Sequence, residues 1–277
     1  MMGVLNLTPD SFSDGGLWDD PAQAVERGLA MLAEGADLLD LGAESTRPGG
    51  GVYGGGARTV PPGEEAARLL PVLEGLRRHT DAPLSVDTRK GEVARQALAA
   101  GADLINDVSA LGDPELAQAV AEAGCPLVLM HSRGDLATMQ QGIRFHDLLR
   151  EVRGELAAAA GRARAAGIDE SQLILDPGIG FGKTAAQNLA LLARLNELAG
   201  LGRPLLVGAS RKSFIAKAAA RPDAPEAPPA ARLGGSLAAV AWAAALPAAL
   251  VRVHDVAETA QFLDVWQAIA QQREGGA

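Results

Sequence analysis

Charged and polar residues recur at the ends of short apolar segments in this 277-residue chain. The positions that are cationic, or can become so, are Arg47, Lys212, Arg252 and His254. The positions that offer carboxylate or amide groups are Asp87, Asn106 and Asp176. The first set is suited to a phosphate or a carboxylate, and the second to a flat heterocycle with donor and acceptor edges. If the fold brings both sets together, they predict one pocket for an anionic ligand that carries a polar ring.

Each of these positions alone also has a structural explanation. An aspartate after a strand is often the N-cap of the next helix, which would account for Asp87. Asn106 or Asp107 could equally be a turn residue. The functional interpretation depends on their convergence, because a buried ring of polar groups is costly unless each finds a partner or a ligand.

Two further segments carry residue types suited to binding. The stretch DPGIGFGKT, residues 176–184, resembles a phosphate-binding loop, but three residues lie between Gly178 and Gly182, so the GxxxxGK[ST] spacing of a nucleoside triphosphatase is not met. Its glycines are expected to let the backbone approach a ligand, with Phe181 as an apolar wall. The stretch SRKSFI, residues 210–215, is expected to begin a helix whose free N–H groups, together with Ser213, bind an anion.

These residues must be positioned by the apolar runs that they follow. The runs span residues 3–7, 37–41, 83–87, 104–108, 126–131, 173–176, 204–209 and 249–254. Such runs are typical of parallel strands covered on both faces, and amphipathic stretches lie between them. The alternation predicts a (β/α)8 TIM barrel that forms a single domain over residues 1–277, with an open doubly wound sheet as the structural alternative. In a barrel, the C-terminal strand ends meet at one mouth, where the chemistry of this fold is found.

Local signals mark helix starts and interruptions of the pattern. Asp20-Pro21 and Asp113-Pro114 each combine an N-cap acid with proline at the first helical position, and apolar spacing predicts a helix over residues 145–156. The glycine-rich segment 47–62 is expected to be a lid that substrate orders, with a merely flexible connection as the alternative. The Pro/Ala-rich segment 221–232 is expected to be an exposed, semi-rigid excursion without chemistry.

Composition narrows the class of protein. The formal net charge of −9 argues against nucleic acid or an anionic membrane as a partner. The single cysteine, Cys125, cannot form a disulfide within the chain and is expected to be a buried packing residue. The N-terminus lacks the features of a signal peptide, and the most apolar tract, residues 236–251, is shorter than the ~20 residues of a membrane span. We therefore expect a cytoplasmic protein that acts on small molecules.

Seven motifs resemble those of the dihydropteroate synthase family and occur in the same order over nearly the whole chain. They are GVLNLTPDSFSDGG (3–16), GAESTRPG (42–49), SVDTRK (85–90), INDVSA (105–110), DPGIGFGK (176–183), GASRKSFI (208–215) and RVHDV (252–256). The first two are highly specific for this family. The resemblance implies a TIM barrel that joins p-aminobenzoate to a pterin pyrophosphate in folate biosynthesis, depends on Mg²⁺, forms a homodimer and is inhibited by sulfonamides.

The resemblance also implies roles for individual residues. The positions that match the pterin pocket are Asp87, Asn106, Asp176, Lys212 and, beside the ring, Arg252. Asn6 and His254 match residues near the pyrophosphate and its metal, so Asn6 is expected to contact Mg²⁺. Arg47 matches a lid arginine that meets the leaving pyrophosphate. The positions around p-aminobenzoate, or between the two substrates, are Thr46, Pro48, Phe181 and Ser213.

The motif MHSRG, residues 130–134, departs from the family at Ser132 and Arg133, which leaves the contribution of this loop open. The chain also begins almost on its first strand, where members of the family usually carry a short segment that covers the barrel floor.

The implied reaction needs no nucleophilic side chain, because the amine of p-aminobenzoate displaces pyrophosphate from a methylene carbon of the pterin. The expected catalytic residues are Asp87, Asp176, Lys212 and Arg47. The nearest alternative is a pterin-binding methyltransferase barrel, which shares the pocket but does not need the Arg47 lid. A catalytically inactive barrel that acts as a regulatory partner would instead predict losses at the strand ends, and the sequence has none.

Overall fold

The computed structural model describes residues 1–8, 20–44, 59–134, 139 and 141–274. Its strands form a closed parallel barrel in sequence order, in which β1 pairs with both β2 and β8. The strands are β1 (Met2–Asn6), β2 (Leu38–Gly42), β3 (Leu84–Asp87), β4 (Leu104–Asp107), β5 (Leu127–Met130), β6 (Leu173–Asp176), β7 (Leu205–Val207) and β8 (Ala249–Val253). The closure confirms the predicted TIM barrel and rules out the open sheet.

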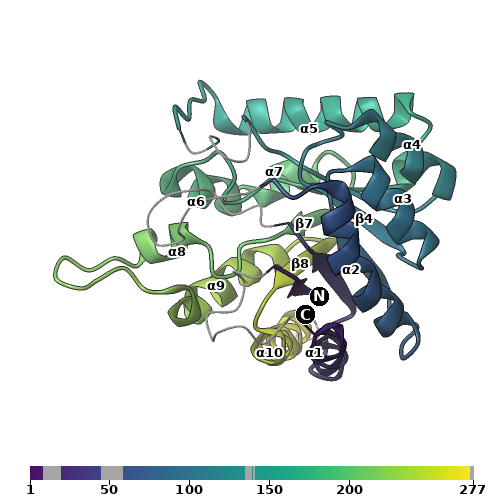
Figure 1. The fold of residues 1–277 in the computed structure, drawn as a ribbon. Coiled ribbons are helices and arrows are strands. Elements are labelled where there is room, and N and C mark those ends of the chain that lie inside the picture. The colour runs from purple at the N-terminus through teal and green to yellow at the C-terminus, as the bar shows by residue number, and fades with distance from the viewer. Residues whose placement is uncertain (9–19, 45–58, 135–138, 140, 275–277) are drawn as a thin grey trace.

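Helices surround the strands, as Figure 1 shows. They are α1 (Pro21–Ala33), α2 (Pro62–Arg77), α3 (Gly91–Ala99), α4 (Pro114–Ala123), α5 (Leu148–Ala165), α6 (Ala185–Ala193), α7 (Leu195–Ala199), α8 (Ser213–Ala218), α9 (Leu233–Ala244) and α10 (Val256–Glu274). The side chains of Asp20 and Asp113 cap α1 and α4, so both predicted starts are confirmed. The helix predicted from Phe145 begins later, at Leu148, because Asp147 caps it there.

The predicted excursion projects from the barrel between α8 and α9 (Figure 1), and residues 221–226 are exposed. Arg232, at its end, corrects the prediction, since only 2% of this residue is exposed. Its guanidinium donates to the carbonyls of Ala227 and Arg211, each at 2.8 Å. The excursion is therefore tied to the loop that precedes α8.

The barrel interior changes from apolar to polar along the strands. The apolar layer contains Met2, Leu38, Leu104, Val128, Ile174, Leu206 and Leu250. Side chains alternate along a strand, so the next residue on the same face lies two positions further on. On β2, β4, β6 and β8 these next residues are Asp40, Asn106, Asp176 and Arg252. Four strands thus deliver polar groups to the same end of the barrel, above an apolar floor.

Candidate functional site

A buried ion-pair network joins β2, β3, β4 and β8 at the barrel mouth. The Arg252 guanidinium donates through Nε to Asp40 Oδ2 at 2.6 Å and through Nη2 to Asp87 Oδ2 at 3.0 Å. Asp40 is fully buried and also accepts hydrogen bonds from Ser85 Oγ and, at 3.2 Å, from Asn106 Nδ2. This carboxylate fixes the amide orientation of Asn106, because only its Nδ2 group can donate. Two residues predicted to bind the pterin are therefore oriented by one carboxylate.

Asp87, the last residue of β3, has a strongly shifted pKa. Burial raises the pKa of its carboxyl to about 7, although Arg252 opposes the increase and Asp40 adds to it. The group can therefore gain or lose a proton near neutral pH. A ligand that brings N–H donors or positive charge would favour its ionised form.

The other half of the site joins the ends of β6 and β7. Asp176 accepts a hydrogen bond from the backbone N–H of Gly178 at 2.7 Å. Lys212 donates to the carbonyl of Ile179, and its Nζ lies 4.2 Å from the centre of the Phe181 ring. Burial lowers the pKa of Lys212 to about 8, against the opposing effect of Asp176, and burial raises the pKa of Asp176. Both groups are held where water screens them poorly, so each would interact strongly with a polar ligand.

The loop between β6 and α6 depends on glycines in the left-handed backbone region. Gly178 has a φ of 66°, and a Cβ there would lie 1.9 Å from the carbonyl oxygen of His131. Gly180 has a φ of 86°, and its Cβ would lie 2.6 Å from Cδ of Lys212. The close approach of this backbone is therefore made to groups of the protein itself, and it sets Phe181 beside Lys212.

Some of the remaining predicted residues lie at or just after the C-terminal ends of β1, β7 and β8, and the others lie outside the described residues. The helix α8 begins at Ser213, as predicted, and Asn6 ends β1. His254 Nδ1 lies 3.1 Å from Ser210 Oγ, which connects the ends of β7 and β8. The predicted residues outside the described ranges are Thr46, Arg47 and Pro48. Most of the predicted lid, 47–62, also falls outside them.

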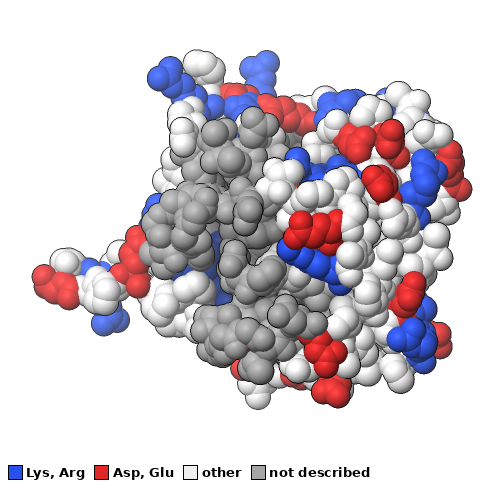
Figure 2. Space-filling view, in the orientation of Figure 1, with Lys and Arg blue, Asp and Glu red and all other residues white. Residues whose placement is uncertain are grey.

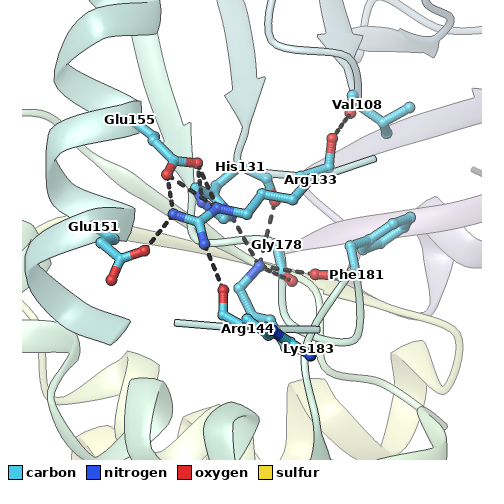
Figure 3. A network of polar contacts seen from close by, with 10 residues as sticks. Val108, His131, Arg133, Arg144, Glu151, Glu155, Gly178, Phe181 and Lys183 are labelled. Atoms are coloured by element: carbon cyan, nitrogen blue, oxygen red, sulfur yellow. Dashed lines mark hydrogen bonds and ion pairs between the residues drawn. The ribbon is translucent and has the colours of Figure 1, made fainter. Parts of the chain in front are cut away.

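Two contributors to the site are absent from the residues predicted from sequence. Asp40 follows Leu38 by two positions, so the alternation along β2 could have placed it inside the barrel. Lys183 gave no comparable signal beyond its glycine motif. Figure 3 shows that Lys183 belongs to a second polar network, together with His131 and Glu155.

The MHSRG motif is now accounted for by structural contacts. Arg133 forms ion pairs with Glu151 and Glu155 of α5 (Figure 3), and its guanidinium carbon lies 4.0 Å from the centre of the Phe145 ring. Ser132 Oγ donates to the carbonyl of Val108 at 3.0 Å. Both side chains hold the loop after β5 against its neighbours.

Two kinds of feature are absent from the described residues. These residues contain no group of three or more His, Cys, Asp or Glu side chains placed to hold a metal ion. None of the helices in these ranges is long and apolar enough to cross a membrane. On the face drawn in Figure 2, basic and acidic side chains are interspersed over the described surface.

Comparison with known proteins gives concordant matches. The family model described as pterin binding enzyme matches residues 2–254. The dihydropteroate synthase of Synechocystis sp. is 46% identical over 270 residues, which covers 97% of this chain and 89% of that protein. The structure of Yersinia pestis dihydropteroate synthase in a sulfonamide complex has a TM-score of 0.89 at 42% identity, covering 98% and 94% of the two chains. Xanthomonas albilineans dihydropteroate synthase with 4-aminobenzoic acid has a TM-score of 0.87 at 48% identity, covering 97% and 92%.

Proposed function

We propose that this chain, which belongs to the pterin-binding enzyme family, is a transferase with dihydropteroate synthase activity. It joins p-aminobenzoate to 6-hydroxymethyl-7,8-dihydropterin pyrophosphate and releases 7,8-dihydropteroate and pyrophosphate. One observation carries the proposal: the residues that match the family's pterin pocket converge on one barrel mouth. These residues are Asp87, Asn106, Asp176, Lys212 and Arg252.

The hydrogen-bond acceptors of the pocket suit the N–H groups of a pterin ring. Asp87, Asp176 and the oriented amide of Asn106 would accept hydrogen bonds from ring N–H groups. Lys212 would donate to an acceptor on the ring, and Arg252 would lie beside it. Because Asp40 holds Arg252 and Asn106 in place, little side-chain ordering remains to be done when the ligand binds.

The chemistry requires stabilisation of charge that develops as pyrophosphate leaves. Positive charge grows on the pterin methylene, and the carboxylates of Asp87 and Asp176 would stabilise it. Burial raises the pKa of both carboxyls, which means that their ionised forms are poorly solvated in the free protein. A positive charge that develops nearby would therefore stabilise these ionised forms strongly. Arg47 and His254 would stabilise the departing pyrophosphate, and the start of α8 at Ser213 would hold the carboxylate of p-aminobenzoate. The lid would exclude water, which competes with the amine for the cation.

A Mg²⁺ ion is part of this proposal. Mg²⁺ prefers oxygen ligands and is commonly held by one or two protein groups together with substrate phosphates. Asn6, at the end of β1, offers an amide oxygen of this kind, and the pyrophosphate would supply others. The bound ion would neutralise charge on the leaving group. Removal of the metal with EDTA should abolish turnover, and added Mg²⁺ should restore it.

The activity can be tested with purified protein, the pterin pyrophosphate, Mg²⁺ and p-aminobenzoate. Dihydropteroate should form, and a sulfonamide should compete with p-aminobenzoate. No product above the background without enzyme would refute the proposal. Pterin binding without turnover, combined with methyl transfer from a methylated folate, would instead identify a methyltransferase.

We extend the proposal to a homodimer that uses the outer faces of α6, α9 and α10. These helices are neighbours, and they carry the large hydrophobic residues that are most exposed in the described chain: Leu189 at 43%, Trp242 at 55%, Val265 at 55% and Ile269 at 60%. A second copy of the chain would cover this apolar surface. Light scattering should give twice the monomer mass, and Trp242→Lys should reduce it to the monomer value.

We also propose that the protein works in the cytoplasm. The lone cysteine, Cys125, is buried and has no partner for a disulfide within the chain, so a reducing compartment suits it. Fractionation of cells that express the chain should recover it in the cytoplasmic fraction, and recovery from an exported fraction would contradict this.

A further inference from the structure

Lys183 is a buried lysine that no step proposed above uses. Only 3% of this residue is exposed. Its Nζ lies 3.0 Å from His131 Nδ1, 2.9 Å from the carbonyl oxygen of Gly178 and 2.9 Å from that of Phe181 (Figure 3). An ammonium group has three N–H donors, and here it faces these three acceptors. The carbonyl oxygen of His131 lies further from Nζ, at 3.4 Å, so the three shorter contacts match the three donors of the protonated amine. Burial lowers the pKa of Lys183 to about 7, and Asp176 opposes the decrease.

The orientation of this ammonium is set by His131 and Glu155. Burial and the charge of Lys183 together lower the pKa of the His131 ring to about 4, against the opposing effect of Glu155, so the ring is neutral at physiological pH. A neutral ring that accepts from Lys183 at Nδ1 must carry its proton on Nε2, which lies 3.0 Å from Glu155 Oε2. A chain of polar contacts therefore runs from α5 through the ring to the lysine.

The two carbonyls that Lys183 holds belong to the turn that carries Phe181. The Phe181 N–H donates to the Gly178 carbonyl at 3.0 Å, so Lys183 binds both ends of this turn. Gly178 also donates to Asp176, and the Phe181 ring lies over Nζ of Lys212. The position of the turn thus decides where Phe181 stands relative to two residues of the pterin pocket.

We propose that Lys183 is a positioning residue that fixes Phe181 at the p-aminobenzoate side of the site. His131, together with Glu155, orients the ammonium group of Lys183. This inference rests on the proposed function for the identity of the ligand beside Phe181. The turn, residues 178–181, and Lys183 both lie within the DPGIGFGK motif. The predicted effect of removing Lys183 is largest for p-aminobenzoate, because the hydrogen bonds of Lys183 go to His131 and to the backbone of the turn that carries Phe181, whereas Asp176 and Lys212 are reached only through that turn and by charge.

Steady-state kinetics of Lys183→Met tests this inference. Methionine keeps the length of the side chain and removes all three donors. We expect the KM for p-aminobenzoate to rise at least tenfold, while the KM for the pterin pyrophosphate changes less than threefold. Lys217→Met, which changes an exposed lysine on α8, is the matched control and should leave both constants unchanged.

A second pair of variants separates positioning from simple packing and remains informative if Lys183→Met does not fold. His131→Asn keeps an acceptor at the place of Nδ1, whereas His131→Leu removes it. The asparagine variant should retain a KM for p-aminobenzoate within threefold of wild type, and the leucine variant should resemble Lys183→Met. Equal changes in both KM values, or no difference between the two His131 variants, would overturn the inference.

Deuterium exchange of the peptide that covers residues 177–184 gives a readout that does not depend on turnover. Exchange should be faster in Lys183→Met and His131→Leu than in wild type, with peptides from β1 to β4 unchanged. If wild type makes no dihydropteroate, the proposed function fails, but this comparison still decides the role of Lys183. Unchanged exchange in both variants would refute it.

Discussion

Replacing Asp40 with asparagine should weaken both the fold and the pterin pocket, and the structure allows the size of the effect to be worked out. Asp40 Oδ2 faces only donors, from Arg252 and Asn106, so an amide group cannot occupy that side. Oδ1 faces the hydroxyl of Ser85, which can turn and accept instead. The substituted side chain can therefore keep the geometry and lose only the charge.

The loss follows from the partners that remain. Removing one partner of a buried ion pair costs about 3 to 5 kcal/mol when the other charge is left alone. Arg252 keeps Asp87 at 3.0 Å, so we expect a value below this range, about 2 to 3 kcal/mol in the free energy of unfolding. A protein of this size should then melt roughly 3 to 5 °C lower.

Urea denaturation and pterin calorimetry, on wild type and Asp40→Asn, provide the measurement. Pterin affinity should fall about tenfold, because Asn106 and Arg252 lose the group that orients them. Ser85→Ala is the companion variant, since it should cost more in the Asp40→Asn background, where the hydroxyl must accept, than in wild type. A stability within 0.5 kcal/mol of wild type, at about the error of the method, together with unchanged affinity would refute this reasoning.

The remaining predictions concern pH, charge and backbone space. Burial raises the pKa of Asp87 to about 7, and the pterin needs the ionised form of this carboxyl. Pterin affinity, measured by calorimetry, should therefore fall about tenfold for each pH unit below 7, and Asp87→Asn should remove this dependence. The same pH dependence in Asp87→Asn as in wild type would contradict the assignment. Lys212→Ala should weaken pterin binding at least tenfold, about 1.4 kcal/mol, and unchanged affinity would remove Lys212 from the pocket. Gly178→Ala should abolish p-aminobenzoate saturation, because its Cβ would meet the His131 carbonyl at 1.9 Å. Gly124→Ala is the control, because Gly124 also has a left-handed φ but a Cβ there would meet no other atom. This variant should lose only about 1 to 2 kcal/mol in the free energy of unfolding. Similar defects in the Gly124 and Gly178 variants would show that backbone strain, and not collision with the His131 carbonyl, matters at Gly178.

The barrel could be predicted because its signals are local. Each strand is a continuous apolar run, and capping acids such as Asp20 and Asp113 mark helix starts within a few residues of where they act. The error at Phe145 has the same origin. Its spacing fits the face of α5, but it packs against the core from the loop before Asp147, and spacing alone does not distinguish these two placements.

The site could be predicted where a polar residue lies near the end of a strand or where a family motif follows the strand, as at Phe181 and Lys212. Asp87, Asn106, Asp176 and Arg252 met the first condition, and the structure brings them together. Asp40 lies in the middle of β2, where the alternation from Leu38 gives its inward direction, but its three donors come from β3, β4 and β8 and leave no trace in the sequence around it. The burial of Arg232 and of Lys183 likewise depends on carbonyls that only the folded chain presents.

The pairing of Arg252 with Asp40 also constrains the order in which the protein folds. The two residues are 212 positions apart, and β8 is the last strand to be synthesised. Until β8 closes the barrel, Asp40 and Asp87 have no Arg252 to compensate them, so the mouth cannot be buried without a penalty. We therefore expect a partly made chain to pack the residues of the apolar floor that precede β8 early, and to complete the pocket last. In refolding experiments, the ability to bind the pterin should return with the slowest phase, after most of the helical signal has recovered.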